Sequence, residues 1–265
     1  MVFTKRSLIT LIILALVLGA IYYFFARKGI TYIWHWEKVP EMLFYYGPKS
    51  PDDPTTKLRM GVLMIGFMLT LKISLVSILF AIIVGTVFGI ARLSNEPVTK
   101  AISLAYVELI RNTPLLVQIY IIYFFAGSIL RLSAFAAGTA ALSIFAGAYV
   151  AEIVRAGIQS ISKGQMEAAR SLGMSYAQAM RHIILPQAFK RIIPPLAGQF
   201  ISLIKDSSLV SVIALADLMF QGQQAVARTY YAFEIYFTVA FLYLVMTFTL
   251  SMATQYIERR LAISD

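Results

Sequence analysis

The sequence has no cysteine and only two histidines, His35 and His182. The absence of cysteine excludes a disulfide framework, a thiolate nucleophile and an iron–sulfur site. The scarcity of histidine excludes a histidine-rich metal site, so we expect no metal ligands in this chain. The phosphate-binding pattern Gly-x-x-x-x-Gly-Lys-[Ser/Thr] and the hydrolase patterns Gly-x-Ser-x-Gly and His-Glu-x-x-His are also missing. We therefore expect a chain that is not an ATPase, binds no cofactor itself and has no catalytic residues.

Charge is scarce as well. Only 14% of the 265 residues are charged and 59% are hydrophobic, whereas soluble domains have about 25% charged residues. A soluble protein of this length has too little interior to bury so much apolar surface. The composition excludes a disordered chain, a fibrous protein and an ordinary soluble enzyme. It predicts an all-α, polytopic membrane helix bundle that lies in the lipid bilayer.

The net charge of +10 does not indicate a nucleic-acid partner. Proteins that bind nucleic acid have clustered basic residues, often interleaved with aromatic side chains on which bases stack. Here the basic residues are dispersed through a hydrophobic chain, and cytoplasmic loops of membrane proteins carry such an excess.

Six stretches have about the 20 apolar residues that cross a bilayer. They lie at 8–25, within 60–91, at about 101–130, and at 133–154, 196–218 and 235–257. The second stretch is too long for one upright span. Its start, residues 60–69, is therefore predicted to be an interfacial helix that turns into the membrane.

The first stretch follows two basic residues, as a signal peptide does, but it ends in bulky aromatic residues without a small-x-small cleavage site. We expect residues 1–26 to form an uncleaved membrane anchor. Residues 27–59 contain four of the nine prolines and both tryptophans, which predicts a connecting segment on the outer face. Residues 60–260 are expected to form the main transmembrane domain.

Six spans place both termini on one side of the membrane. Lys and Arg are more numerous on the side of the N-terminus, and six of them lie in the loop 155–191. Because basic loops stay in the cytoplasm, both termini are predicted to be cytoplasmic.

The loop 155–191 is itself predicted to be helical. Residues 164–172 form a short helical pattern that Gly173 ends, and a second amphipathic pattern runs from Ser175, a natural N-cap, to Leu185. Pro186 is expected to stop or kink this second helix. Physical reasoning leaves two interpretations open: a helical hairpin on the membrane surface, or a docking site for a soluble partner.

The spacing in this loop resembles the EAA loop of type I ABC importer permeases. Glu-Ala-Ala is followed after three residues by Gly, and after nine more by Ile-x-Leu-Pro. Other segments are similar to the polar amino acid permeases of that group, namely ELIRNTPLLVQ at 108–118, GAYVAEI at 147–153 and IKDSSL at 204–209. The resemblance extends from about residue 60 to residue 260.

This resemblance implies a type I ABC importer fold, with a core of five membrane helices after the anchor. It implies the permease subunit of an ATP-driven amino acid importer in the bacterial cytoplasmic (inner) membrane. The expected partners are a second permease subunit, identical or related, two cytoplasmic ATPase subunits that use ATP and Mg, and an extracytoplasmic amino acid binding protein. The residues that would couple the permease to the ATPase are Glu167, Ala168, Ala169, Gly173, Ile183, Leu185 and Pro186.

Polar residues inside the spans are costly and usually face a cavity or a partner. Gln199, Ser202 and Asp206 share one face of the fifth span, at offsets of zero, three and seven residues. They either line the substrate pathway or form a hydrogen-bond network between helices. Lys72, in the second span, either extends to the interface or meets a substrate carboxylate.

A second polar stripe lies in the third span. Glu108, Arg111 and Gln118 are predicted to share one helical face, and the first two can form an ion pair. A structural or gating role is expected for them. Thr113-Pro114 is predicted to kink this helix.

Two shorter patterns concern helix contacts. Glu152 and Arg155 are expected to form a local ion pair one turn apart. The pattern Gly85-x-x-x-Gly89 would allow two helices to approach closely.

Phe145-Ala146 stands where many of these permeases have Asn-Ser. The change removes polar groups from the fourth span, so it favours an acidic or amide amino acid such as glutamate, aspartate or glutamine. The alternative is a basic amino acid or another small polar solute. Outside this class, a membrane enzyme using Asp206, Lys205 and Glu152, or a gated channel, would also be a hydrophobic helix bundle.

Overall fold

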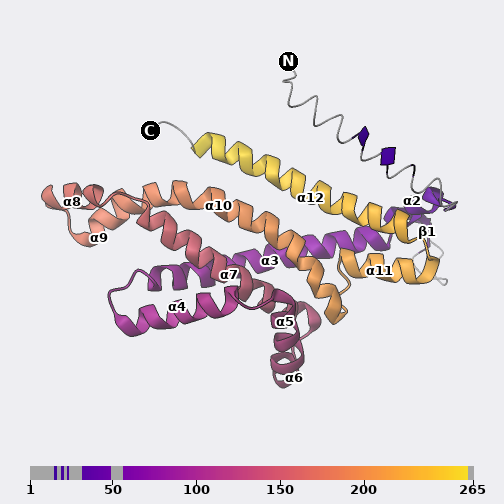
Figure 1. The fold of residues 1–265 in the computed structure, drawn as a ribbon, viewed down its shortest axis with the longest axis horizontal. Helices are drawn as coiled ribbons and strands as arrows, with labels where there is room; N and C mark the ends of the chain where they lie inside the picture. Colours follow the sequence, from indigo (N-terminus) through magenta and orange to yellow (C-terminus); the bar gives the residue numbers. More distant parts are fainter. Residues whose placement is uncertain (1–14, 17–18, 21–22, 24–31, 49–55, 262–265) are drawn as a thin grey trace, which may run out of the picture. The chain divides into compact units, whose positions relative to one another are not determined.

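The computed structural model describes residues 15–16, 19–20, 23, 32–48 and 56–261, with side chains described up to residue 256 (Figure 1). The chain forms two compact units, Met1–Trp36 and Glu37–Asp265. Most of the predicted anchor, residues 1–26, lies outside the described residues. The fold below is that of the second unit.

A small hairpin precedes the membrane helices. The helical turns η1 (Trp36–Lys38) and α2 (Val39–Leu43) lead into β1 (Phe44–Gly47), which pairs antiparallel with β2 (Lys57–Met60), with Phe44 opposite Met60. The sequence predicts only a connecting segment here. The aromatic run at residues 44–46 favours an extended strand over a helix.

Helix α3 (Val62–Ala91) is continuous over 30 residues. The prediction of a separate interfacial helix at residues 60–69 was therefore wrong. No proline lies between residues 62 and 91, and proline is the usual cause of such a break. At 1.5 Å per residue the helix is about 45 Å long, and a tilt accommodates a helix longer than the hydrocarbon core.

The third predicted span is broken. Helix α4 (Pro97–Arg111) ends before Pro114, and the following helix, formed by α5 (Leu115–Tyr120), the π-helical η2 (Ile121–Ala126) and α6 (Gly127–Leu130), departs at 106°. The predicted kink is confirmed, and it is a sharp bend. The side chains of Asn112 and Thr113 donate to carbonyl oxygens one turn earlier, at 2.7 and 2.6 Å, and so satisfy the end of α4.

The chain then returns in α7 (Ala134–Gln159), followed by α8 (Lys163–Ser171), α9 (Tyr176–Ala179), the π-helical η3 (Met180–Ile184), α10 (Leu185–Asp206) and the 3-10 helix η4 (Ser207–Ile213). The helical path runs from Tyr176 to Ile213 as one long span, so the expected stop at Pro186 is not observed. The wider π turn directly before Pro186 gives the helix a different hydrogen-bond pattern, where an α-helix would lose a bond and clash with the proline ring.

Helices α11 (Leu218–Thr229) and α12 (Ala232–Leu261) complete the chain. Within the described ranges, four helices are long and apolar enough to cross a membrane, or five when the bent pair α4 and α5–α6 counts as one span. This agrees with the five-helix core expected from the resemblance.

Helix α3 packs closely along α7 (Figure 1). A Cβ atom on Gly85 would lie 2.6 Å from the carbonyl oxygen of Gly147, and one on Gly89 would lie 2.7 Å from that of Ala151. The close approach predicted from Gly85-x-x-x-Gly89 is thus confirmed. The α7 side of the contact is lined by small buried residues, which let the two backbones meet.

Candidate functional site

The helix predicted to couple to a partner is exposed at one end of the second unit (Figure 1). In α8, Glu167 and Ala168 are exposed, whereas Ala169 is 4% exposed and faces the protein. A Cβ atom on Gly164 would meet no other atom within 4 Å. Gly164, Ala168 and Ser171 therefore form one exposed stripe of small residues along α8, which permits the close approach of another protein.

Gly173 ends α8 in a Schellman motif. Its φ is +84°, its N–H donates to the carbonyl of Arg170 at 3.0 Å, and the N–H of Met174 donates to that of Ala169 at 3.2 Å. The left-handed backbone at this position favours glycine. The glycine terminus predicted from the sequence is confirmed.

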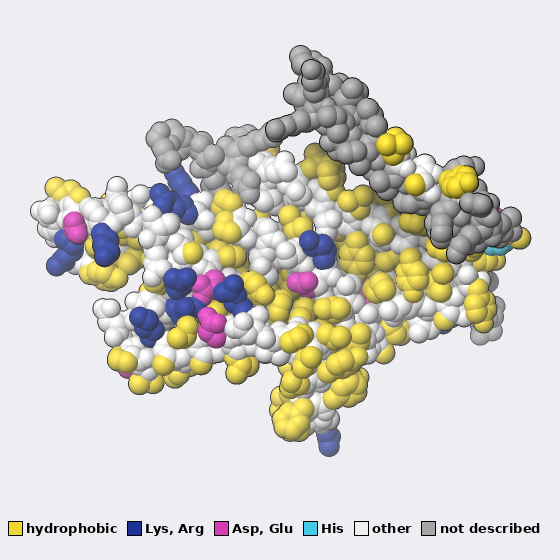
Figure 2. Space-filling view, viewed as in Figure 1, with side chains coloured by type: hydrophobic (Ala, Val, Ile, Leu, Met, Phe, Trp, Pro, Cys, Tyr) yellow, Lys and Arg dark blue, Asp and Glu magenta, His cyan; other side chains and the backbone are white. Residues whose placement is uncertain are grey.

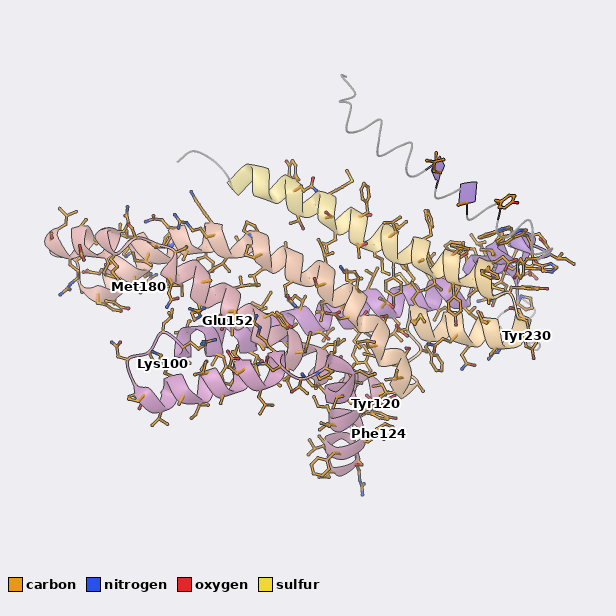
Figure 3. All side chains as sticks on the ribbon, viewed as in Figure 1. Lys100, Tyr120, Phe124, Glu152, Met180 and Tyr230 are labelled. Carbon is orange, nitrogen blue, oxygen red and sulfur yellow. The ribbon has the colours of Figure 1, made fainter. Side chains whose placement is uncertain are left out.

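The second half of the loop anchors α8 to the membrane helices. Ser175 and Gln178 form a capping box at the start of α9. Ile183 and Met180 pack against the main core cluster, and Met180 lies close to the α8–α9 end (Figure 3).

At the start of α10, Leu185 is half-buried and Pro186 is exposed. Gln187 of α10 donates to the Gln165 side chain of α8 at 3.4 Å, so α8 and α10 are directly linked.

Sequence reasoning missed two large residues beside the glycine turn. Leu172 is 84% exposed and Tyr176 is 62% exposed. The sequence signal for them is an apolar residue on each side of a polar turn. Such residues become exposed apolar surface, which marks contact sites. Leu172 directly follows α8, and Tyr176 begins α9.

An ion cluster joins α3 to α7 near the same end. Glu152 accepts from Arg155 Nε at 3.1 Å and Nη2 at 2.8 Å, which confirms the predicted pair, and it also forms an ion pair with Arg92. Partial burial, and next the charge of Arg155, lower the pKa of the Arg92 guanidinium. Arg92 was missed because it is 60 residues away in sequence. Figure 2 shows most of the visible Lys and Arg side chains over this end of the unit.

The predicted stripe of Glu108, Arg111 and Gln118 was wrong as a single face, because the helix breaks between Arg111 and Leu115. Glu108 accepts from Asn112 Nδ2 at 3.0 Å, and the Arg111 guanidinium lies 5.1 Å from the ring centre of Tyr149. Gln118 is 6% exposed and donates to the carbonyls of Ile110 and Thr113 at 2.8 and 3.0 Å. It closes the broken end of α4, which is a structural role.

The stripe of Gln199, Ser202 and Asp206 lies along one helix, α10. All three side chains are half-buried, whereas Lys205 is exposed. Lys72 of α3 is exposed, and its Nζ lies 5.3 Å from the ring centre of Phe135. Within the described part of the chain no ion pair joins Lys72 to Asp206.

A buried carboxyl that sequence reasoning did not single out connects three helices. Asp217, fully buried, accepts from the N–H of Phe220 at 2.9 Å and from the hydroxyl of Tyr243 at 3.4 Å. The next N–H, of Leu218, donates to Thr70 Oγ1 at 3.0 Å. Burial raises the pKa of Asp217 to about 6, against the opposing effect of the backbone N–H groups of Phe220 and Met219. The cluster ties α11 to α3 and α12.

Among the described residues, no group of three or more His, Cys, Asp and Glu side chains could hold a metal ion. Several helices of membrane-spanning length, with the exposed helix α8 between two of them, are the architecture of a polytopic membrane protein.

Comparison with known proteins identifies the family. Residues 77–263 match the binding-protein-dependent transport system inner membrane component family. The chain is 47% identical over 197 residues to a probable glutamine ABC transporter permease, GlnM, of Bacillus subtilis strain 168, covering 74% of this chain and 91% of the relative. It is 40% identical to the glutamine transport system permease GlnP of Escherichia coli K12, covering 75% and 92%.

A solved structure, described as a crystal structure of an amino acid ABC transporter with histidines, is 43% identical. It matches with a TM-score of 0.71 over 75% of this chain and 94% of the other. A methionine ABC transporter, MetNI, at 22% identity and a TM-score of 0.68, shares the fold.

The chain belongs to the family of binding-protein-dependent transport system inner membrane components. It is an integral membrane permease subunit of the amino acid ABC importer class, with the type I importer fold. It is not an enzyme, because ATP hydrolysis in such transporters is performed by a separate subunit, and a second permease subunit completes the assembly.

Proposed function

We propose that this chain forms half of the pathway of an ATP-driven importer for a polar amino acid, and that α8 transmits the movements of a cytoplasmic ATPase to the pathway. The observation that carries the proposal is the exposed, small-residue face of α8, fixed by the left-handed turn at Gly173. The ATPase would bind ATP and Mg, and this chain would bind neither.

The seven coupling residues divide into two kinds. Glu167, Ala168 and Pro186 are exposed and would contact the ATPase. Ala169 and Ile183 face the protein and would anchor the helix, Gly173 sets its end, and Leu185 lies at the start of α10. A force on α8 would reach α10 through the chain and through the contact of Gln165 with Gln187.

The pathway is assigned to Gln199, Ser202 and Asp206 of α10, with Lys72 of α3 as a further candidate. The support for the three α10 residues is their shared face on one continuous helix and their half-buried positions. Polar and charged groups in a membrane helix face a cavity or a partner rather than lipid.

Glutamine, or another amide or acidic amino acid, is the proposed substrate. Support comes from the names of the two relatives given above and from the apolar Phe145-Ala146. The alternative is a basic amino acid, since a Bacillus subtilis relative named as an arginine transport permease is 38% identical.

The proposed arrangement is a bacterial cytoplasmic (inner) membrane protein with both termini in the cytoplasm. Its support is the Lys- and Arg-rich end that includes α8 (Figure 2), because basic loops remain inside. Residues 1–26 would be the anchor, 27–59 an outer-face segment and 60–260 the transport domain. An extracytoplasmic binding protein would deliver the amino acid.

The test is to purify the chain with its neighbouring subunits and to measure ATP hydrolysis with each amino acid and its binding protein. We expect a co-purifying ATPase that one loaded binding protein stimulates, and that amino acid is the substrate. Replacing Glu167 with Ala should abolish stimulation, whereas Ser171→Ala, whose hydroxyl bonds only within α8, should not. A well-folded chain without an associated ATPase would refute the proposal.

A further inference from the structure

A pocket lies at the end of the second unit opposite α8, where α2 rests on the start of α3 (Figure 1). A Cβ atom on Gly61 would lie 2.3 Å from the carbonyl oxygen of Met42 and 2.7 Å from that of Glu41. The Gly61 N–H donates to the carbonyl of Leu43 at 2.7 Å. Glycine at this position therefore lets the backbone of α2 touch α3, and this contact fixes the position of α2.

The pocket has a volume of about 440 Å³ and lies between α2 and the turn that joins α11 to α12. Tyr230, with a φ of 61°, makes this turn (Figure 3). The volume is within the range of sites for small molecules. The lining residues that matter for recognition are Lys38, Glu41, Met42, Tyr45, Thr229 and Tyr231.

The two charges of the lining are opposite and close in sequence. Lys38 ends η1 and Glu41 lies three residues later in α2, and both side chains line the pocket. Within the described part of the chain they form no ion pair with each other or with a third group. One cation and one anion thus border the same small space, beside the apolar side chain of Met42.

We propose that this pocket binds a free α-amino acid. The Lys38 ammonium would receive the α-carboxylate, the Glu41 carboxylate would receive the α-ammonium group, and the rest of the ligand would lie along Met42 and Tyr45. A ligand of one sign would satisfy only one of the two groups, whereas a zwitterion with both charged groups on one carbon atom satisfies both. Hydrogen bonds to charged groups are the stronger ones.

The inference rests on the proposed function, which places this end of the unit on the outer face. The site would hold the amino acid where it enters the permease, and it is distinct from the polar stripe of α10. Lys38 and Glu41 lie before the residues that match the family, whereas Thr229 and Tyr231 on the other side of the pocket lie within them.

The test uses the full chain in lipid nanodiscs without ATPase or binding protein. Three probes are titrated by calorimetry: L-glutamine, glutaramate, which lacks the α-ammonium, and 4-aminobutanamide, which lacks the α-carboxylate. Lys38→Gln should weaken L-glutamine and glutaramate by about tenfold and leave 4-aminobutanamide unchanged. Glu41→Gln should weaken L-glutamine and 4-aminobutanamide by about tenfold and leave glutaramate unchanged.

Lys57→Gln is the matched control, because Lys57 is exposed on β2 and does not line the pocket. L-glutamine binding by Lys38→Gln and Glu41→Gln at the wild-type affinity would overturn the inference. Equal weakening of all three probes by both variants would also overturn it, since that pattern indicates a distorted fold. Stimulation of the co-purified ATPase is a separate readout, so the proposed function can stand while this inference fails.

Discussion

At the scale of single residues, two glycines of the loop occupy very different positions: Gly164 lies inside α8, and Gly173 lies just after its end. Gly164 lies within the helix, and a Cβ there would meet nothing within 4 Å. Gly173 also has open space around it, but its φ of +84° is a conformation that side chains with a Cβ avoid. Only the second glycine is required by the backbone.

We therefore expect Gly173→Ala to destabilise the α8–α9 turn by about 1 kcal/mol and to lower stimulated ATP hydrolysis. Gly198→Ala, the matched control, should preserve hydrolysis, because Gly198 lies in α10, away from α8, and nothing lies within 4 Å of its Cβ position. The measurement is stimulated ATP hydrolysis by the reconstituted complex. Equal activity of the two variants would refute the requirement for the left-handed turn, and Gly173→Pro with normal uptake would refute the docking helix itself.

Asp217 predicts a pH dependence of stability. Its pKa is about 6 in the folded protein, above its ordinary value of 3.8, so the folded state binds the proton more tightly. This contribution to stability is fully present below about pH 4 and is lost as the pH rises through about 6. Asp217→Asn removes the titration and keeps an N-cap residue.

The thermal unfolding midpoint of the wild type should therefore fall relative to that of Asp217→Asn between pH 5 and pH 8. Purified protein in one detergent at constant salt provides the comparison. Parallel curves for the two proteins over this range would show that the carboxyl does not titrate there.

At the scale of elements, the sequence predicts correctly those features that depend on a few neighbouring residues. The kink at Pro114, the N-cap at Ser175, the end of α8 at Gly173 and the small-residue contact of Gly85 all follow from chain geometry. The sequence does not predict where a helix continues without a break. Helix α3 is continuous where an interfacial helix was expected at residues 60–69. At Pro186 the helix does not stop, although a π turn directly precedes the proline.

The α3–α7 contact carries a direct prediction. A Cβ on Gly85 would lie 2.5 Å from Val150 Cβ, so Gly85→Ala forces the helices apart and should destabilise the protein by about 1–3 kcal/mol. Gly198→Ala in α10 is the control, because nothing lies within 4 Å of its Cβ position. The free energy of unfolding in mixed detergent measures both. If Gly85→Ala proved as stable as Gly198→Ala, the close packing would be wrong.

At the scale of the whole molecule, the candidate sites were only partly predictable. The coupling residues follow one another within 20 positions, so their spacing could be read in the sequence. The Arg92–Glu152 pair, the Asp217–Tyr243 contact and the pocket around Lys38 join residues far apart in the chain. Such contacts depend on how α3 packs against α7, α11 and α12, and a single sequence does not state that packing.

The proposed route from the outer face to the cytoplasm requires the polar stripe of α10. We expect Asp206→Ala to reduce substrate uptake by about tenfold, since a substrate would lose a hydrogen bond to a charged group, while the ATPase still co-purifies. Lys205→Gln is the matched control: it changes the neighbouring charge, but its side chain is exposed and lies off the stripe. Uptake into proteoliposomes, compared with ATPase binding in the same preparation, separates transport from assembly. If Asp206→Ala transports as the wild type does, the assignment of the stripe to the pathway is wrong, and the pathway lies elsewhere in the bundle.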